Sequence, residues 1–462
     1  MKFFIVCPRG LEIPLAEELK EISERAEVKS MGAWVIDPPP ANSTGGLGVA
    51  GPMSVAFAIN LHSRIASRCL LQMTHVAYRK EDDIYKAVRS LSWEDWLTPD
   101  QTMRVDLTAH RSPLTSLNFV TLRIKDAVCD RLREVKGARP SIDTELPDVR
   151  VQAHLTATHA TVYLDTSGQS LFKRGWRDDK GAAPLKENLA AGILALTGWR
   201  PEQPLFDPMC GSGTFLIEAA YRGLGIPSGS IRAGLLNAKP AEEATPAVQE
   251  KSESGKFTRY RPTRVDLVGA DQGFGFQRLK PFNTPDLKKQ WDGLCGVAKK
   301  DIETGLANAN KLKMAACDIN ENMITIVKSN WKRAGLPAQS GVLSNVRQID
   351  ALVAKSPFAD PGVMLFNPPY GERLEIKGVT KSRGARDALP KNNNSPEFME
   401  FLNQFGKHLK DDFQGWQVDV LTADMGLPGQ LRMKESKRTP LFNGPLECRL
   451  FRFEMKKPTS ND

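Results

Sequence analysis

Closely spaced cysteines and long apolar runs are both missing from this sequence. Its seven cysteines are scattered and none forms a C-x-x-C pair, which excludes the usual spacing of a zinc site and the framework of a disulfide-rich protein. No apolar run approaches the ~20 residues that cross a membrane, and the run at residues 3–7 is too short for a signal-peptide core. We therefore expect reduced cysteines, no metal, no membrane partner and a cytoplasmic location.

The composition is that of a large globular protein with an excess of basic side chains. The 462 residues are 41% hydrophobic and carry a formal net charge of +9. This length suggests roughly three domains of ~150 residues each. The positive charge favours a polyanionic partner such as a nucleic acid.

Residues 1–169 divide into two α+β segments. Residues 1–78 follow the order β-α-β-β-α-β, which is typical of a ferredoxin-like domain. We predict its strands at 2–7, 28–36, 53–59 and 72–78, its helices at 11–22 and 61–71, and a loop at 38–51. In residues 79–169 we predict helices at 82–91 and 122–135, a strand at 103–109 and a hairpin at 149–165. The expected buried face of the second helix consists of Leu122, Val128, Leu132 and Val135.

A basic connector at residues 170–196 follows. Arg174, Arg177 and Lys180 lie in the stretch L-F-K-R-G-W-R-D-D-K, which is either a hinge that touches nucleic acid or a solvated linker. The next stretch, A-P-L-K-E-N-L-A-A-G-I-L-A-L at 183–196, includes Lys186 and is predicted to form a helix.

Residues 197–456 are organised around the stretch L-F-D-P-M-C-G-S-G-T-F-L-I-E-A-A at 205–220. It has the pattern of a buried strand, a glycine loop and a helix, an arrangement that can cradle a cofactor. Three later strands, predicted at 314–317, 347–349 and 363–366, are followed by Asp318, Asp350 and Asn367. In open α/β sheets, ligands bind at such carboxyl ends. We expect a helix carrying Phe398 and Leu409, strands at 416–421 and 446–453, and a tail at 457–462.

An insertion rich in glycine, proline and serine interrupts this region at about 223–313. It includes a strand candidate at 265–271. Its basic and aromatic residues at 257–264 either engage RNA or belong to a solvated loop.

The glycine loop departs from two common nucleotide-binding motifs. No lysine follows Gly213 as a P-loop requires, and Leu216 stands at the third glycine of G-x-G-x-x-G. A carboxylate at Asp207 would repel phosphates but suits a cationic ligand, and S-adenosylmethionine carries an ammonium and a sulfonium group. Asp318 is placed to accept hydrogen bonds from ribose hydroxyls, and Asp350 from an adenine amine. Taken singly, each aspartate is equally a candidate helix N-cap.

The second informative motif is F-N-P-P-Y at 366–370. Two consecutive prolines remove N–H donors and stiffen the backbone, so Asn367 and the nearby carbonyls form a rigid set of acceptors for an exocyclic amine. Tyr370 would stack on the base. A Pro-Pro turn without function is the alternative. The order of D-P-M-C-G-S-G-T, Asp318 and N-P-P-Y favours methyl transfer to an amine.

The chain resembles the bacterial large-subunit (23S) rRNA guanine-N(2) methyltransferases of the RlmL type. The resemblance rests on the two motifs above and on P-R-G-L-E at 8–12, R-G-W-R at 174–177, A-P-L-K-E-N-L-A-A at 183–191, N-P-P-Y-G-E-R-L at 367–374 and N-G-P-L-E-C at 443–448. It implies an α/β fold in which ferredoxin-like and THUMP α+β domains precede a Rossmann-like class I methyltransferase with a seven-stranded sheet. Some members carry a second methyltransferase domain, which we do not expect here.

The resemblance also implies roles for individual residues. Those expected to bind S-adenosylmethionine are Asp207, Pro208, Cys210, Gly211, Gly213, Thr214, Asp318 and Asp350. Those expected to hold the guanine amine are Asn367, Pro368, Pro369 and Tyr370, and those expected to bind RNA are Arg174, Arg177 and Lys186. The implied substrate is large-subunit rRNA or its precursor particle. A tRNA guanine, a DNA adenine, or a role as an rRNA-binding assembly factor with little activity remain alternatives.

Overall fold

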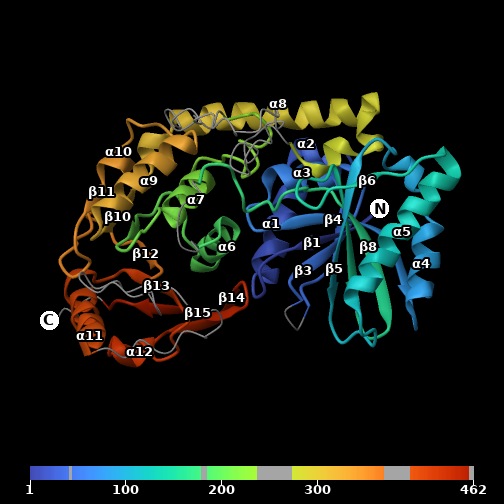
Figure 1. Ribbon diagram of the computed structural model, residues 1–462. Coiled ribbons are helices and arrows are strands. Elements are labelled where there is room, and N and C mark those ends of the chain that lie inside the picture. Colours follow the sequence, from blue (N-terminus) through green and yellow to red (C-terminus); the bar gives the residue numbers. More distant parts are fainter. Residues whose placement is uncertain (41–43, 178–184, 237–272, 369–395, 457–462) are drawn as a thin grey trace, which may run out of the picture. The chain divides into compact units, whose positions relative to one another are not determined.

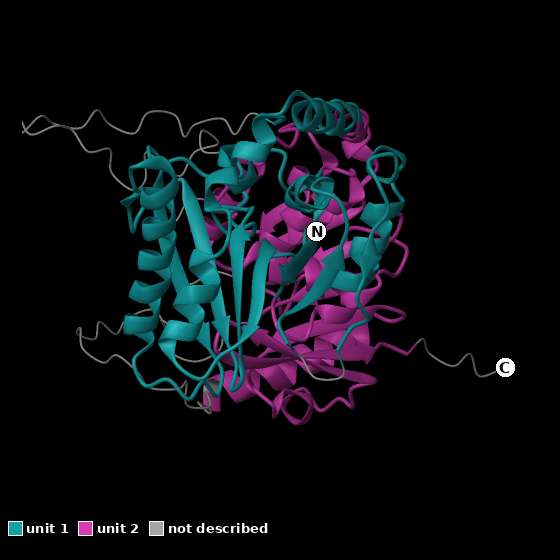
Figure 2. Ribbon diagram, turned by 90° about the vertical axis from the view of Figure 1, so that its right-hand side faces the viewer, with its two compact units in different colours: residues 1–7, 15–175, 227–300 teal, residues 8–14, 176–226, 301–462 magenta. Residues whose placement is uncertain are grey.

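A computed structural model describes residues 1–40, 44–177, 185–236, 273–368 and 396–456. The chain forms two compact units, which Figure 2 shows in different colours. Unit 1 comprises residues 1–7, 15–175 and 227–300, and unit 2 comprises residues 8–14, 176–226 and 301–462. Lys180, Pro369, Tyr370, the tail and the segments predicted at 257–264 and 265–271 lie outside the described residues. Within the described part of the chain, no helix combines the length and apolar character needed to span a membrane.

Unit 1 is built on one eight-stranded sheet, with the order β2-β3-β1-β4-β8-β7-β5-β6 (Figure 1). Its strands are β1 (Lys2–Val6), β2 (Val35–Ile36), β3 (Gly46–Ala50), β4 (Arg68–Ala77), β5 (Thr102–Ala109), β6 (Ser141–Ile142), β7 (Val149–Leu155) and β8 (His159–Asp165). Strand β5 is parallel to β6 and β7, and all other neighbours are antiparallel. Because β4 pairs with β8, the two predicted α+β segments share a single sheet.

The predictions for residues 26–71 are partly wrong. The helices of this region are α1 (Glu12–Glu24), α2 (Ala26–Lys29) and α3 (Ser54–His62). Helix α3 replaces the strand expected at 53–59, and β3 lies inside the expected loop. Every residue of α3 is buried, so its sequence shows no alternation of polar and apolar faces that would identify a helix. The overall order β-α-β-β-α-β is nevertheless present.

The second half of unit 1 matches its predicted elements closely. Its helices are α4 (Glu81–Arg89), η1 (Trp93–Asp95) and α5 (Leu117–Lys136). The Ser116 hydroxyl caps α5 by accepting from the Phe119 N–H at 3.3 Å, and Gly137 ends the helix with φ +75°. The predicted inward face is half wrong, because Leu122 and Val135 are 51% and 42% exposed whereas Val128 and Leu132 are buried.

Part of the predicted insertion belongs to unit 1. Residues 227–236 and the segments η3 (Gly275–Arg278), η4 (Lys280–Asn283) and α8 (Pro285–Ala307) as far as Lys300 are grouped with the eight-stranded sheet. The Phe57 ring of α3 lies 4.7 Å from that of Phe276 and 6.1 Å from that of Trp291, measured between centroids. The insertion therefore supplies apolar cover for helix α3.

Unit 2 contains a seven-stranded sheet with the order β11-β10-β9-β12-β13-β15-β14. Its strands are β9 (Leu205–Asp207), β10 (Met314–Asp318), β11 (Val346–Gln348), β12 (Val363–Phe366), β13 (Gln417–Thr422), β14 (Lys437–Asn443) and β15 (Leu446–Glu454). The first five strands in this order are parallel, and β15 runs antiparallel to both β13 and β14. The predicted fold class, an α/β domain with a Rossmann-like seven-stranded sheet after two α+β segments, is confirmed.

Helices cover the sheet of unit 2 and enclose its core. They are α6 (Glu187–Thr197), α7 (Thr214–Gly223), η5 (Ala309–Lys311), α9 (Glu321–Arg333), α10 (Gly341–Ser344), α11 (Pro396–Asp412) and α12 (Leu427–Gln430). The apolar stripe of α11, with Leu402, Phe405 and Leu409, packs in one buried cluster with Phe366 and Val418 of the strands. This packing fixes the strand ends that carry the polar residues described next.

Candidate active site

Four polar residues lie at one edge of the seven-stranded sheet. Asp207 ends β9 and Asp318 ends β10, while Asp350 and Asn367 closely follow β11 and β12. These four strands are parallel neighbours, so their carboxyl ends meet at the same edge. The structure therefore brings together residues that are separated by up to 160 positions in the sequence.

The loop between β9 and α7 depends on two glycines with left-handed backbone conformations. Gly211 has φ +51° and Gly213 has φ +80°. A Cβ at Gly213 would lie 2.9 Å from Cγ1 of Val327, whereas a Cβ at Gly211 would meet nothing within 4 Å among the described residues. Gly213 thus permits close packing of the loop on α9, and Gly211 leaves open space beside the loop.

Asp318 holds the loop in place through the backbone. One carboxylate oxygen, Oδ2, accepts from the Gly211 N–H at 2.9 Å, and Oδ1 accepts from the Asn320 N–H at 2.9 Å. Asn320 is the N-cap of α9, where its side chain accepts from the Asn322 N–H. Asp318 is therefore not the cap of that helix.

Asp207 is a buried carboxyl at the base of the loop. It is 2% exposed, and its Oδ1 accepts from the Met209 N–H at 3.2 Å. Burial raises its pKa well above the ordinary value, and the nearby Asp318 charge raises it further. Within the described residues it has no cationic partner, so an incoming positive group would stabilise its charged form.

The buried thiols beside these carboxylates are poor nucleophiles. Burial raises the pKa of Cys317 to about 12, with further contributions from Asp207, Asp318 and Asp350. The Cys317 thiol donates to the Pro208 carbonyl at 3.4 Å. Burial likewise raises the pKa of Cys210 well above its usual range. Both thiols are therefore unsuited to act as nucleophiles, and contact between Cys210 and a cofactor stays a prediction. The Asp350 carboxylate accepts from the Leu352 N–H at 2.9 Å.

Arg177 supports the loop between β9 and α7. Its guanidinium donates to the Ser212 hydroxyl at 2.8 Å and to the Thr214 hydroxyl at 2.7 Å, and it pairs with Glu187 at 2.8 Å. Burial raises the pKa of Glu187, and the Arg177 charge opposes this rise. Asn330 adds a further contact by donating to the Ser212 carbonyl at 3.0 Å. The roles of Glu187 and Asn330 were missed by sequence reasoning, although Asn330 is a polar residue on the otherwise apolar side of α9.

The residues predicted to bind RNA lie in different environments. Arg174 is 3% exposed and donates to the carbonyls of Leu171 and Arg64 inside unit 1. Arg177 is mostly buried, as described above. Both positions favour a structural role, because their guanidinium groups are occupied by the protein. Lys186 is exposed at the start of α6, and contact with RNA stays a prediction for it.

Asn367 presents a buried acceptor at the end of β12. Its Oδ1 is inaccessible to solvent and has no hydrogen-bond partner among the described residues. Pro368, which follows, is buried and has no N–H to offer. A buried amide oxygen without a partner is costly, so a ligand donor at this point would be favoured.

Comparison with known proteins identifies the family. Residues 174–382 match the family model described as "RMKL-like, methyltransferase domain", and residues 78–165 match the THUMP domain. The chain is 30% identical over 453 residues to the "Putative RNA methyltransferase slr0064" of Synechocystis sp., with 98% of this chain and 96% of that protein covered. The chain belongs to the RlmL-like family of RNA methyltransferases.

Other relatives of this RlmL-like chain are longer. It is 32% identical over 460 residues to "Ribosomal RNA large subunit methyltransferase K/L" of Syntrophotalea carbinolica, covering 98% of this chain but 54% of that protein. The chain thus spans about half the length of the K/L relatives that it matches. The crystal structure of SMU.472 complexed with SAH has the same fold, with a TM-score of 0.70 at 22% identity and coverage of 99% and 98% of the two chains. Family membership makes the chain an S-adenosylmethionine-dependent methyltransferase, which confirms the predicted cofactor.

Proposed function

We propose that this enzyme methylates the exocyclic amine of a guanine in large-subunit (23S) rRNA. The observation that carries the proposal is the Asn367 Oδ1, a buried acceptor without a described partner at the cofactor edge of the sheet. An exocyclic amine has two N–H groups, of which one would be accepted by this oxygen.

The residues at the sheet edge fit S-adenosylmethionine. Asp207 offers a buried carboxylate for a cationic group, and the position of Gly211 is open where a Cβ would otherwise intrude. Asp318 ends β10 and Asp350 follows β11, the two strands next to β9 on one side of the sheet. Acceptors for the ribose hydroxyls and the adenine amine are expected at these strand ends. When bound, this cofactor supplies an electrophilic methyl group on its sulfonium.

Asn367 would act by positioning the amine. Accepting one N–H fixes the orientation of the amino group, so that the nitrogen lone pair is directed away from the protein acceptor and toward the methyl donor. The buried setting excludes water as a competing donor to Oδ1. Such alignment of the reacting atoms is worth orders of magnitude in rate. Pro368 keeps the backbone rigid at this point.

The choice of rRNA is supported by the relatives. Several proteins named "Ribosomal RNA large subunit methyltransferase K/L" match nearly the whole of this chain at 29–32% identity. The THUMP match at residues 78–165 supports an RNA substrate over DNA. A guanine in tRNA and an adenine in DNA are outcomes that the following experiment separates.

The test supplies the protein with isotope-labelled S-adenosylmethionine and unmodified 23S rRNA, precursor particles, tRNA or DNA. Mass spectrometry of the digested nucleic acid should reveal labelled N2-methylguanosine from the rRNA. Label found in tRNA or DNA alone would overturn the proposal.

A variant pair tests the amine clamp. Asn367→Ala should reduce the methylation rate by about a hundredfold or more with little change in cofactor affinity. Asn310→Ala, an exposed asparagine of unit 2, should leave the rate unchanged. Full activity in Asn367→Ala would exclude the clamp.

A further inference from the structure

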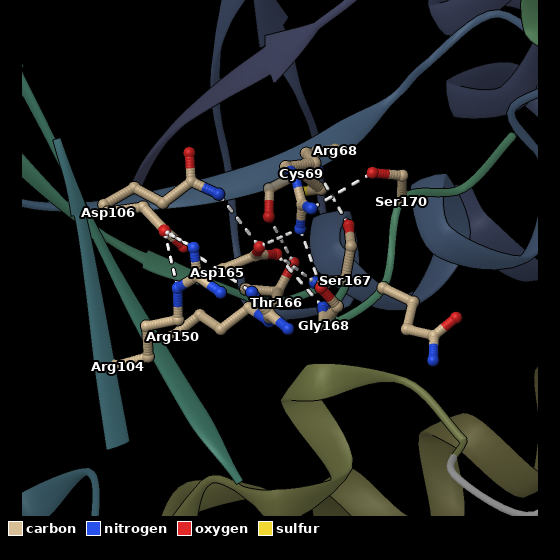
Figure 3. Close-up of polar contacts among 12 residues, drawn as sticks. Arg68, Cys69, Arg104, Asp106, Arg150, Asp165, Thr166, Ser167, Gly168 and Ser170 are labelled. Atoms are coloured by element: carbon tan, nitrogen blue, oxygen red, sulfur yellow. Dashed lines mark hydrogen bonds and ion pairs between the residues drawn. The ribbon is translucent and has the colours of Figure 1, made fainter. Parts of the chain in front are cut away.

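A charged network in unit 1 is closed on itself (Figure 3). Arg68 pairs with the buried Asp165, and it also donates to the Gly168 carbonyl at 2.7 Å and to the Ser170 hydroxyl at 3.0 Å. The other oxygen of Asp165 accepts from the N–H groups of Ser167 and Gly168. Because its charges are satisfied by the protein, this network fixes the turn after β8 and offers no charge to a ligand.

In unit 2, the loop after β11 carries Asp350 and is held near both of its ends. We call residues 350–356 the Asp350 loop. Just before it, the Ile349 N–H donates to the Asp318 carbonyl at 3.2 Å, which ties the end of β11 to β10. Near its other end, Ala354 is 1% exposed and packs in the buried cluster with residues of α11. The position of the Asp350 loop therefore depends on a neighbouring strand and on α11.

His408 of α11 holds the Asp350 loop by a contact with its backbone. The Nε2 atom lies 2.8 Å from the Ala354 carbonyl oxygen, and Nδ1 lies 2.9 Å from an oxygen of Asp412. The ring is 9% exposed and packs edge-on against Phe413, with centroids 5.5 Å apart. The other Asp412 oxygen pairs with Lys355 at 3.1 Å, but Lys355 is 73% exposed, and such surface pairs contribute little. The buried His408 contact is therefore the main polar anchor of the loop.

Both ring nitrogens of His408 face groups that can only accept. The ring donates to the carboxylate and to the carbonyl at once only when each nitrogen carries a proton. The hydrogen bond from Lys355 and the charges of Lys355 and His408 hold the pKa of Asp412 below its ordinary value, so an ionised carboxylate lies beside the ring. A charge-assisted donor makes a stronger hydrogen bond than a neutral one. Loss of this donor would leave the Ala354 carbonyl buried without it, which is costly.

Asp350 has one carboxylate oxygen available for a ligand. Its Oδ1 accepts from the Leu352 N–H at 2.9 Å, and its backbone carbonyl accepts from the Val353 N–H at 3.1 Å. Among the described residues, no donor contacts its Oδ2. The loop therefore folds around Asp350 and leaves this oxygen available to accept from the adenine amine.

We propose that His408 is a positioning residue for cofactor binding, which holds the Ala354 carbonyl so that Asp350 accepts from the adenine amine of S-adenosylmethionine. The proposal rests on the role proposed above for Asp350. Without the N–H donor, the loop should relax toward solvent, where water satisfies the Ala354 carbonyl, and Asp350 should move with it. The loss should therefore fall on the contact with the amine.

Calorimetric titration with two ligands tests this role. One is S-adenosylhomocysteine, and the other is S-inosylhomocysteine, in which a carbonyl replaces the adenine amine. The parent protein should prefer the adenosyl ligand by about tenfold or more, because only its amine donates to the carboxylate. His408→Phe keeps a ring beside Phe413 but has no N–H. It should bind the adenosyl ligand about tenfold more weakly and the inosyl ligand as the parent protein does.

Two further variants separate the hydrogen bond from other effects of substitution on α11. His408→Gln retains an amide N–H donor and should recover part of the lost preference. The matched control is Gln404→Ala, because Gln404 is an exposed hydrogen-bonding residue one turn earlier on α11 that donates to Glu400. It should leave both affinities unchanged. Equal losses for both ligands in His408→Phe would indicate general destabilisation and overturn the proposal.

Amide hydrogen exchange of the cofactor-free protein gives a second readout. In His408→Phe, the N–H groups of Leu352 and Val353 should exchange about tenfold faster, while those of α7 and α9 should exchange at the parent rate. Unchanged exchange in the Asp350 loop would show that His408 does not hold it. Faster exchange throughout unit 2 would likewise overturn a specific positioning role.

Asp350→Ala separates the two roles. If this variant loses the preference for the adenosyl ligand while His408→Phe keeps it, Asp350 binds the amine and His408 does not position it. If Asp350→Ala keeps the preference, the proposed role of Asp350 fails and the role of His408 fails with it. None of these measurements uses RNA. A failure to methylate rRNA guanine would therefore overturn the proposed function and leave the result for His408 as it stands.

Discussion

Replacement of Gly213 by alanine should destabilise unit 2 for two separable reasons. The first is conformational, because φ +80° places an alanine in the left-handed region at a cost of about 1–2 kcal/mol. The second is steric, because the new Cβ would lie 2.9 Å and 3.1 Å from the two γ-carbons of Val327, and overpacking costs about 1–3 kcal/mol. A small gain of about 0.4–1 kcal/mol from reduced freedom of the unfolded chain offsets part of this. The expected net loss is about 2–4 kcal/mol.

Gly211 and Val327 provide matched controls for these two effects. Gly211 also has a positive φ, +51°, but a Cβ there would meet no described atom within 4 Å, so Gly211→Ala should cost only about 1 kcal/mol. In a Val327→Ala background both contacting γ-carbons are absent. Gly213→Ala should then cost about as little as Gly211→Ala.

The assay must report on unit 2 alone, since a chain with two compact units need not unfold in one step. Amide hydrogen exchange of α7 and α9, followed by mass spectrometry, measures the free energy of opening in that unit. If Gly213→Ala has the same cost with and without the valine methyl groups, the steric part of the reasoning is refuted. If Gly211→Ala costs as much as Gly213→Ala, the close packing against Val327 has no energetic role.

Three further predictions concern charges of unit 2. Burial raises the pKa of Asp207, so its ionisation opposes folding, and Asp207→Asn should lessen the fall in stability above about pH 4. The same variant should bind the cofactor at least about tenfold more weakly in calorimetric titration. Unchanged cofactor affinity would contradict the proposed role of this carboxylate. Burial raises the pKa of Asp419 to about 6, so the stability that this group contributes falls as the pH rises from about 4 to 6. In that window, Asp419→Asn should flatten the dependence of the free energy of unfolding, measured with urea, on pH. An unchanged dependence on pH would disprove the raised pKa of Asp419. Arg177→Ala leaves Glu187 buried without its ion-pair partner and should destabilise unit 2 by about 3–5 kcal/mol. Arg177→Lys should lose less stability, because it keeps the positive charge. Equal melting temperatures for the two variants would argue against this ion pair as the source of the stability.

The sheet edge could be predicted because its information is local in sequence. Asp207, Asp318 and Asn367 each stand at the end of a short apolar segment, and Asp350 follows the short strand β11, so parallel strands bring these residues together whatever lies between them. The role of Arg177 could not be found in this way. Its contacts join a connector to hydroxyl groups 35 and 37 residues away, and nothing in a basic linker distinguishes a buried guanidinium from an exposed one.

The errors in unit 1 have a similar physical origin. Strand β3 contains two glycines, Gly46 and Gly48. Glycine is more typical of loops than of strand interiors, so the sequence favoured a loop here. A Cβ at Gly48 would lie 1.9 Å from an oxygen of Asp37, so glycine is required there by a close contact that the sequence does not reveal. Helix α3 is buried on every side, and its apolar run therefore has the appearance of a strand. In both cases tertiary packing determined the structure against the local pattern.

The insertion explains the long spacing between the glycine loop after β9 and Asp318. Strands β9 and β10 are parallel neighbours connected through α7, and such a crossover needs only a dozen or so residues. The surplus includes the described residues 227–236 and 273–300, which are grouped with unit 1. There, Phe276, Phe282 and Trp291 surround Phe57, which is fully buried. The core beside the eight-stranded sheet therefore includes aromatic rings of a segment that the chain encodes between two neighbouring strands of the seven-stranded sheet.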